Sequence, residues 1–471
     1  MLFNSFRFTL LFLPLTAGIY ALLGARATHR VRQTWILICS VFFYAVGQTS
    51  NLPLLLASIV FNWAVARAMM SRPEAKARRI LLGCGIGVDI GALFLFKYFN
   101  FLLHSLAFLF PAGHLLPDWN IPLGLSFFTL TQVMYLVDTY HGLNGPNSLF
   151  DHATVVTFFP YLTSGPLVRL RAVAPQLRGA SRQDGYPDVV CRGLYLFSLG
   201  IAKKVILADS FTAVADAGFN CIRDFSLFEA WAFTVAFLFQ LYFDFSGYSD
   251  MAVGAAWMMG IDIPQNFNGP LRATSVTEFW QRWHISLSTF ITNYLYTPIL
   301  RSMRRATLSA SVVATILAMA LAGLWHGPAW TYVLYGFSHG VALATNQVWR
   351  RSKLNMPDWA GWLVTQMFAA ASLVFFRAAD TQSAMRMLSR LVPHANALDT
   401  SALKAVPVSA SVIGVPVIAA LIAAYAPQSS TKLASAFRPT VSTAVKTAAL
   451  LLASMMFMNS APAKQFVYFG F

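Results

Sequence analysis

The sequence predicts an all-α, polytopic integral membrane protein, and three observations indicate this class. Hydrophobic residues make up 57% of the 471 residues and charged residues only 11%, whereas a soluble domain is about half apolar and about a quarter charged. So few polar side chains could not cover a soluble protein of this length. Apolar runs of about 20 residues, the length that a helix needs to cross a bilayer, also recur along the chain. This composition excludes a disordered chain, a disulfide scaffold and a water-soluble nucleic-acid binder.

The apolar runs predict about 11 to 13 membrane crossings, together with re-entrant or interfacial helices. The run at 153–168 contains Pro160, Gly165 and Pro166, so we expect a partial span that protein or a cavity covers. No internal repeat or low-complexity linker divides the chain, and we expect residues 1–471 to form a single membrane domain. The candidate spans are 6–24, 33–50, 52–70, 80–98, 121–137, 153–168, 188–207, 227–243, 308–325, 329–348, 360–376, 408–425 and 442–458.

The basic residues predict how the chain is oriented. Its formal net charge is +16, and in a multi-span protein lysine and arginine collect in cytoplasmic loops, where they meet anionic headgroups. Basic residues follow the first and third spans, whereas the connection at 48–53 has no charge, so we expect the N-terminus on the outer side. Membrane lipids, and not nucleic acid, are the expected partners of this charge. The basic residues are Arg26, Arg30, Arg32, Arg72, Lys76, Arg78 and Arg79, with later clusters at Arg301, Arg304, Arg305, Arg350 and Arg351.

Four stretches hold polar residues inside this apolar context, where such residues are costly and usually functional. They cover residues 158–169, 240–252, 264–290 and 323–340. In the last of them, His326 lies between two apolar runs, with Gly327 and Pro328 breaking the helix beside it. A neutral imidazole there could act as a general base. The alternative is an interfacial histidine that is hydrogen-bonded to a neighbouring carbonyl. For His339, farther along the same stretch, we favour structural packing.

The stretch at 264–290 is too polar to span the membrane and too aromatic for an ordinary loop. Trp280 and His284 are four residues apart and share a helical face. The segment suits a re-entrant helix whose polar residues meet a phosphate-rich ligand, or equally an amphipathic helix that lies on the headgroups. Its candidate ligand-binding residues are Asn266, Asn268, Arg272, Arg282 and Trp283.

Asp244 interrupts an aromatic run in the stretch at 240–252. A buried carboxylate must be paired or protonated, so Asp244 could orient an imidazole, bind an arginine or close a helix end. No histidine and carboxylate spacing predicts a metal site. The four cysteines, which we expect to be isolated thiols, show no C-x-x-C pair: Cys39, Cys84, Cys191 and Cys221.

Two of these stretches resemble the motifs of the membrane-bound O-acyltransferase (MBOAT) family. They are W-x-x-W-H-I-S-L-S-x-F-x-x-x-Y-L-Y-x-P at 280–298 and G-L-W-H-G-x-x-W-T at 323–331. Four further segments resemble the bacterial branch that contains the membrane subunits of alginate and other exopolysaccharide O-acetyltransferases: the opening M-L-F-N-S-F-R-F-T-L-L-F-L-P-L, Y-F-D-F-S-G-Y-S-D-M-A, Q-N-F-N-G-P-L-R-A-T-S and the closing F-V-Y-F-G-F. Where that branch has a Gly-rich basic run, this chain reads I-L-R-S-M-R-R at 299–305. Alginate, acetylated cellulose and other exopolysaccharides are therefore all open as the polymer.

The resemblance implies an MBOAT-like fold, a multi-pass protein of the bacterial inner membrane and two catalytic positions, His326 and His284. It also implies an O-acetyltransferase that holds no permanent cofactor and takes its acetyl group from acetyl-CoA on the cytoplasmic side. Trp325, Asp244 and the residues of the 264–290 stretch would then bind the substrate or the donor. The expected partners are a periplasmic acetyltransferase with a nucleophilic serine and a polysaccharide synthesis complex. D-alanyl transfer to teichoic acid is one alternative, and a lipid or polysaccharide transporter is the other.

Overall fold

The computed structural model describes most of the chain, and every regular element in the described residues is a helix. Two compact units are formed, one by 1–198, 249–265 and 434–449, the other by 199–248, 266–433 and 450–471. The structure describes residues 1–24, 27–106, 121–179, 186–220, 225–352, 354–393, 399–404, 410–426, 428–460 and 464–467. Arg26 and Cys221 lie outside these ranges, whereas the other three cysteines are free thiols.

Helices of the first unit begin and end where the sequence changes from apolar runs to caps and turns. Thr28 caps α2 by accepting a hydrogen bond from the Val31 amide, and prolines occupy the first turns of α1 and α3. The elements are η1 (Arg7–Phe12), α1 (Leu13–Leu23), α2 (His29–Gln48), η2 (Thr49–Asn51), α3 (Leu52–Met70), α4 (Ala75–Leu93), η3 (Phe94–Tyr98), α5 (Phe99–Ser105), α6 (Leu125–Tyr140), α7 (Leu149–Thr157) and α8 (Leu170–Gly179).

Three long helices, α9 (Tyr186–Ala202), α11 (Leu227–Met258) and α22 (Val441–Ser460), have residues in both units. The second unit also contains η5 (Lys203–Ala208), α10 (Asp209–Phe219), η6 (Pro270–Arg272), α12 (Val276–Arg282), α13 (Ile285–Phe290), η7 (Ile291–Tyr296), α14 (Thr297–Ser302), α15 (Leu308–His326), α16 (Trp330–Trp349), α17 (Asp358–Arg377), α18 (Thr381–Arg390), α19 (Ser401–Lys404) and α20 (Ala410–Tyr425); α21 (Ser430–Ser435) ends in the first.

Six helical segments in the described part of the chain are long and apolar enough to cross a membrane, among them α15, α17 and the segment at 29–70, which comprises α2, η2 and α3. The predicted spans agree closely with the helices: 52–70 is α3, 308–325 is α15, and 360–376 lies within α17. In the stretch 153–168, which we predicted to be a partial span, α7 ends at Thr157 and residues 158–168 are buried without forming a regular helix. The total number of crossings remains a prediction.

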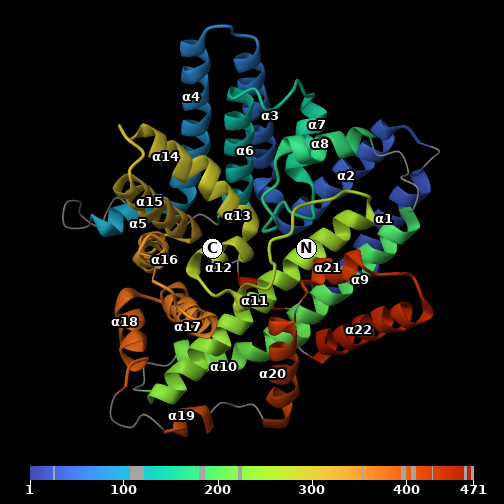
Figure 1. Cartoon of the computed structure of the whole chain (residues 1–471). Helices are drawn as coiled ribbons and strands as arrows, with labels where there is room; N and C mark the ends of the chain where they lie inside the picture. The colour runs from blue at the N-terminus through green and yellow to red at the C-terminus, as the bar shows by residue number, and fades with distance from the viewer. Residues whose placement is uncertain are drawn as a thin grey trace. The chain divides into compact units, whose positions relative to one another are not determined.

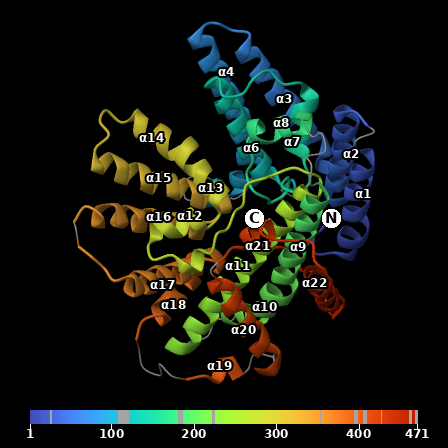
Figure 2. The same cartoon turned by 45° about the vertical axis from the view of Figure 1, so that its right-hand side comes forward.

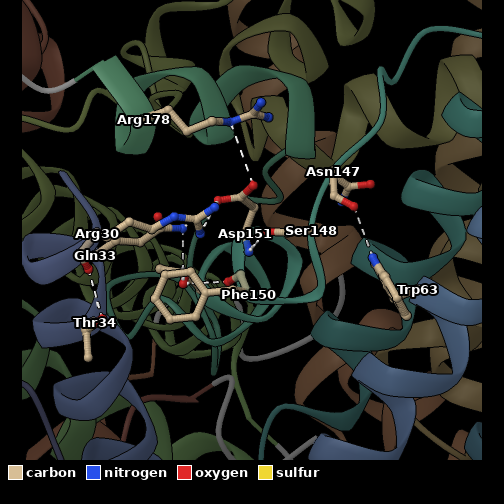
Figure 3. A network of polar contacts seen from close by, with 10 residues as sticks. Arg30, Gln33, Thr34, Trp63, Asn147, Ser148, Phe150, Asp151 and Arg178 are labelled. Atoms are coloured by element: carbon tan, nitrogen blue, oxygen red, sulfur yellow. Dashed lines mark hydrogen bonds and ion pairs between the residues drawn. The ribbon is translucent and has the colours of Figure 1, made fainter.

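A buried carboxylate connects three helices of the first unit (Figure 3). Asp151 of α7 accepts a hydrogen bond from Gln33 Nε2 of α2 at 2.9 Å, and Arg30 and Arg178 approach its two oxygens at 3.8 and 3.9 Å. Burial alone would raise the pKa of this carboxyl, but the hydrogen bonds of Gln33 and Ser148 and the charge of Arg178 hold it below its ordinary value. Asp151 therefore joins α2, α7 and α8.

In the second unit, α15 and α16 form a tightly packed hairpin (Figures 1 and 2). Glycines allow this approach: a Cβ atom at Gly336 would lie 2.2 Å from the Met319 carbonyl oxygen, and one at Gly323 would lie 2.3 Å from the Tyr332 carbonyl oxygen. Small residues bring helix backbones together in the same way in other membrane proteins. The extended residues after His326 reverse the chain, and α17 packs on α16.

We predict that Asp151→Asn destabilises the protein by about 1–3 kcal/mol at pH 7, because the charged hydrogen bonds and ion pairs are lost. A carboxyl with a lowered folded pKa stabilises the protein above its unfolded pKa of about 4. The wild type should therefore lose this advantage as the pH falls through the folded pKa. Thermal unfolding of the purified protein at pH 7 and at lower pH measures the difference. Glu74→Gln, at an exposed residue of the same unit, is the control, and an equal loss in both variants would contradict the prediction.

Candidate active site

His326 ends α15 inside a group of aromatic rings. Its imidazole is 4% exposed and lies edge-on to three rings: those of Trp325 and Phe376, each at 5.1 Å between centroids, and that of Tyr335 at 6.0 Å. The three rings come from α15, α17 and α16. Three successive helices, α15, α16 and α17, thus enclose the imidazole in a pocket of aromatic rings.

His339, in the middle of α16, has both ring nitrogens engaged. The Trp280 indole N–H, which can only donate, binds Nδ1 at 3.1 Å, and the Ser372 hydroxyl lies 2.9 Å from Nε2. Nδ1 must therefore accept, so the neutral ring carries its proton on Nε2 and donates it to Ser372. The Ser372 hydroxyl in turn donates to the Ala369 carbonyl at 2.8 Å. These contacts agree with the packing role that we expected for His339, and they join α12, α16 and α17.

His284 occupies the residue before α13 in a left-handed conformation, with φ of 42° and ψ of 53°. It is the one non-glycine residue with positive φ in the described part of the chain, and such strained backbone often occurs at functional sites. Its ring is 1% exposed and meets the Phe245 ring edge-on at 4.6 Å. Asn266 holds this turn, because its carbonyl accepts from the Ile285 amide at 3.0 Å and its Oδ1 from the Ser286 amide at 3.1 Å.

The polar residues of the 264–290 stretch mainly contact one another. Arg282 Nη2 forms an ion pair with Glu278 Oε1 at 2.7 Å, and its Nη1 donates to the Asn268 carbonyl at 3.2 Å. Glu278 also accepts from the amide and the hydroxyl of Thr274, at 2.8 and 3.0 Å. Burial opposes the ionised form of Glu278, but the bonds from Thr274 and the charge of Arg282 outweigh it and lower the pKa of Glu278. The half-buried Arg272 lies against Gly269.

Trp283 is 2% exposed and belongs to an aromatic cluster. Its ring stacks on that of Phe279 at 5.5 Å and meets that of Phe267 edge-on at 5.1 Å. Tyr242 of α11 lies at 6.2 Å. We therefore find Trp283 in the packing that supports the turn at His284.

Asp244 of α11 is part of a buried ion triad that the sequence did not predict. The Lys204 ammonium lies 2.6 Å from Asp244 Oδ1 and 2.9 Å from Asp209 Oδ1, and both Lys204 and Asp244 are almost fully buried. The Val467 amide donates to Asp244 Oδ2 at 2.8 Å, and the Phe466 ring covers the ammonium at 5.1 Å. The carboxylate thus pairs with a lysine and not with an imidazole or an arginine, and it anchors the C-terminal segment.

A cavity of about 890 Å³ opens within the second unit, lined by residues of α12, α13, η7, α15 and α16. Trp280, Ala318 and Met319 are buried lining residues, whereas Arg350, Arg351 and Asn293 are exposed ones. The wall is thus apolar inside and basic and polar at its exposed edge. The lining residues are Thr277, Trp280, Gln281, Ile285, Ser288, Thr289, Ile291, Thr292, Asn293, Tyr296, Leu308, Ser311, Thr315, Ala318, Met319, Leu343, Gln347, Arg350 and Arg351.

The structure brings the two motifs of the sequence together through contacts that sequence reasoning missed. Trp280 lines the cavity and binds His339, and the Tyr335 ring lies at 4.7 Å from His339 and at 6.0 Å from His326. His284 instead packs beside Phe245, the neighbour of Asp244. Lys204 could have been noticed as a charged residue inside the predicted span 188–207. Nothing in the local sequence pointed to the role of Ser372.

Lys204→Met should destabilise the protein by about 3–5 kcal/mol, because it leaves two carboxylates without their shared cation. The double variant Lys204→Met with Asp244→Leu should recover much of this loss, since an apolar pair can replace a buried ion pair. Thermal unfolding and the yield of inserted protein measure both effects. A double variant as unstable as the sum of the two single variants would show that the pair does not act as a unit.

Comparisons with known proteins identify the family to which the chain belongs. The family model of the membrane-bound O-acyltransferases matches residues 31–359. The chain is 35% identical to the peptidoglycan O-acetyltransferase of Helicobacter pylori over 422 residues, which cover 83% of this chain and 80% of that protein. It is 36% identical to the probable alginate O-acetylase AlgI of Pseudomonas aeruginosa over 394 residues, or 82% of this chain and 74% of that protein.

A more distant similarity extends to another acyl transfer system. The chain is 28% identical to the teichoic acid D-alanyltransferase of Bacillus subtilis over 322 residues, which cover 66% of this chain and 80% of that protein. The matched family region includes both His284 and His326 and residues of both compact units. The chain therefore belongs to the membrane-bound O-acyltransferase family and is a multi-pass membrane acyltransferase.

Proposed function

We propose that the protein transfers an acetyl group from a cytoplasmic donor, acetyl-CoA, to an acceptor on the outer side of the bacterial inner membrane. The single observation that carries this proposal is the environment of His326, whose buried imidazole lies in an aromatic pocket at the end of α15. Tyr335 and His339 connect it to Trp280, a lining residue of the large cavity. Relatives named for peptidoglycan and for alginate O-acetylation, at 35% and 36% identity, support acetyl transfer to a cell-surface polymer.

His326 is the proposed general base. It takes the proton of an acceptor hydroxyl, whose oxygen attacks the thioester carbonyl; the C–S bond then breaks, and the thiolate leaves and is protonated. General bases contribute typically 10²–10⁴-fold to the rate. The aromatic rings around His326 exclude water, which would otherwise compete with the acceptor for the acetyl group. His284 is the second proposed catalytic position, held by its strained turn beside Asn266.

The cavity of the second unit is the proposed donor site. Arg350 and Arg351 are part of a predicted cytoplasmic cluster, and they suit the phosphates of a coenzyme A ester. The buried, mostly apolar wall at Trp280 and Met319 suits the uncharged thioester arm. Three of the predicted binding residues keep a proposed role in binding the substrate or the donor: Arg272, Asn268 and Trp325. The contacts of the other four favour a positioning role. Arg282, Asn266 and Trp283 support the turn at His284, and Asp244 holds α11.

The immediate acceptor is, in our proposal, a serine of a periplasmic acetyltransferase that passes the acetyl group to the polymer within a polysaccharide synthesis complex. Relatives named for alginate and for peptidoglycan support these two polymers as final acceptors, and an exopolysaccharide of the cellulose type is a further candidate. D-alanyl transfer is less favoured because the teichoic acid enzyme is a more distant relative. Because the chain belongs to an acyltransferase family, acyl transfer is favoured over the alternative of a lipid or polysaccharide transporter.

We also propose that both compact units form one functional domain, since the family match covers parts of each.

His326→Ala should lower polymer acetylation by about 10²–10⁴-fold in cells that express the variant in place of the wild type, because the general base is lost. Acetyl content of the isolated polymer is the measurement, with the amount of inserted protein checked by immunoblot. His141→Ala, a substitution of an exposed histidine, is the matched control. Normal acetylation in His326→Ala would refute the general base, and loss in His284→Ala alone would transfer that role to His284.

Arg350→Gln with Arg351→Gln should raise the KM for acetyl-CoA roughly tenfold or more while kcat changes little, because charged contacts to phosphate are lost from a site remote from the reacting atoms. Transfer from radiolabelled acetyl-CoA in proteoliposomes measures both constants. The control is Arg304→Gln with Arg305→Gln, two exposed arginines that do not line the cavity. An unchanged KM in the first pair would show that the donor does not use this cavity. Faster transfer from a D-alanyl thioester than from acetyl-CoA would favour the other acyl group.

A further inference from the structure

A second cavity, of about 580 Å³, lies within the first unit and plays no part in the proposed transfer. Its wall is built from helix ends: the end of α1, the first turn of α2, the end of α8, the start of α9 and the end of α11. Two arginines and three aromatic residues with polar edges contribute to it. They are Arg32, Arg192, Tyr20, Tyr186 and Trp257.

The two arginines are the unusual feature of this cavity. Arg32 is only 8% exposed, and its Nε has no hydrogen-bond acceptor among the described residues. The Nε of the half-buried Arg192 is likewise buried without an acceptor in the described part of the chain. A buried guanidinium without a counter-ion is costly. The neighbouring Arg30 differs, because it pairs with Asp151.

The carboxylate found among the described lining residues, that of Asp262, does not neutralise these arginines. Asp262 is exposed, and its Oδ1 accepts a hydrogen bond from the Trp257 indole at 2.9 Å. Its own amide donates to Gln176 Oε1 at 2.8 Å. Among the described residues no carboxylate lies within ion-pair distance of Arg32 or Arg192. Among the described lining residues, two positive charges therefore face the cavity, and the single negative charge is already engaged.

The position of the cavity indicates the kind of anion that would fill it. Helix ends rimmed by tyrosine and tryptophan are typical of the headgroup level of a bilayer, and Arg32 belongs to a loop that the sequence predicts to be cytoplasmic. Guanidinium groups match the oxygens of a phosphate with paired hydrogen bonds. We propose that this cavity binds the phosphate-bearing headgroup of an anionic phospholipid through Arg32 and Arg192, with Trp257 and Tyr186 beside the glycerol region.

Thermal unfolding of the purified full-length protein in detergent tests the proposal. Short-chain phosphatidylglycerol should stabilise the wild type in a saturable way, whereas short-chain phosphatidylcholine and inorganic phosphate should not. Arg192→Gln should raise the phosphatidylglycerol concentration for half-maximal stabilisation roughly tenfold or more, because a charged hydrogen-bond donor is lost. Arg32→Gln should do the same, and Arg192→Lys should retain part of the effect. Arg438→Gln, at an exposed arginine of the same unit outside the cavity, is the matched control.

Three results would overturn the proposal. Equal stabilisation by phosphatidylcholine would mean that the acyl chains and not the phosphate are bound. Equal stabilisation by inorganic phosphate would identify a site for free phosphate instead of a lipid headgroup. An unchanged response in Arg192→Gln would exclude the arginine contact, and because Arg192 is only half-buried this variant decides the question even where Arg32→Gln fails to fold. Acetyl transfer is not used as the readout, so failure here leaves the proposed function untouched.

Discussion

A bilayer offers no water to a buried polar group, so each such group must find its partner inside the protein. The hydrogen bond from Trp280 to His339 shows how this constraint shapes the second unit. It ties α12 to α16, and the Ser372 hydroxyl on the other ring nitrogen ties α16 to α17. His326 lies beside the same helices, against the rings of Tyr335 and Phe376. The polar contact thus fixes the walls of the pocket in which the proposed base works.

The ion triad around Lys204 satisfies the same constraint, because each charged group in it lies next to a group of opposite charge. Three ionisable side chains meet at one location, and the C-terminal segment covers them through the Val467 amide and the Phe466 ring. Breaking such a group is costly, whereas replacing the whole group by apolar residues need not be. Asp244, which we expected from the sequence to bind the substrate or the donor, holds α11 against η5 through its ion pair with Lys204.

Basic residues have three distinct environments in this protein. Arg30 and Arg282 pair with carboxylates and hold turns and helices together. Arg350 lies at the exposed edge of the large cavity, where a phosphate-bearing donor would enter. Arg32 faces the second cavity without a carboxylate nearby among the described residues. Basic residues of this chain, whose net charge is +16, therefore lie in structural ion pairs, at the exposed edge of one cavity and in the wall of another.

The sequence by itself determined the helical membrane class and most helix positions, because length and hydropathy of a run decide whether a helix crosses a bilayer. It also indicated His326 and His284 as candidate catalytic residues, since polar residues stand out in an apolar chain. Only the tertiary structure decided which polar residues meet. That Asp244 pairs with Lys204 and His339 with Ser372 depends on the packing of helices distant in the chain. Local sequence patterns do not predict such contacts. They form because glycines and helix breaks determine how closely the helices pack and therefore which side chains become neighbours.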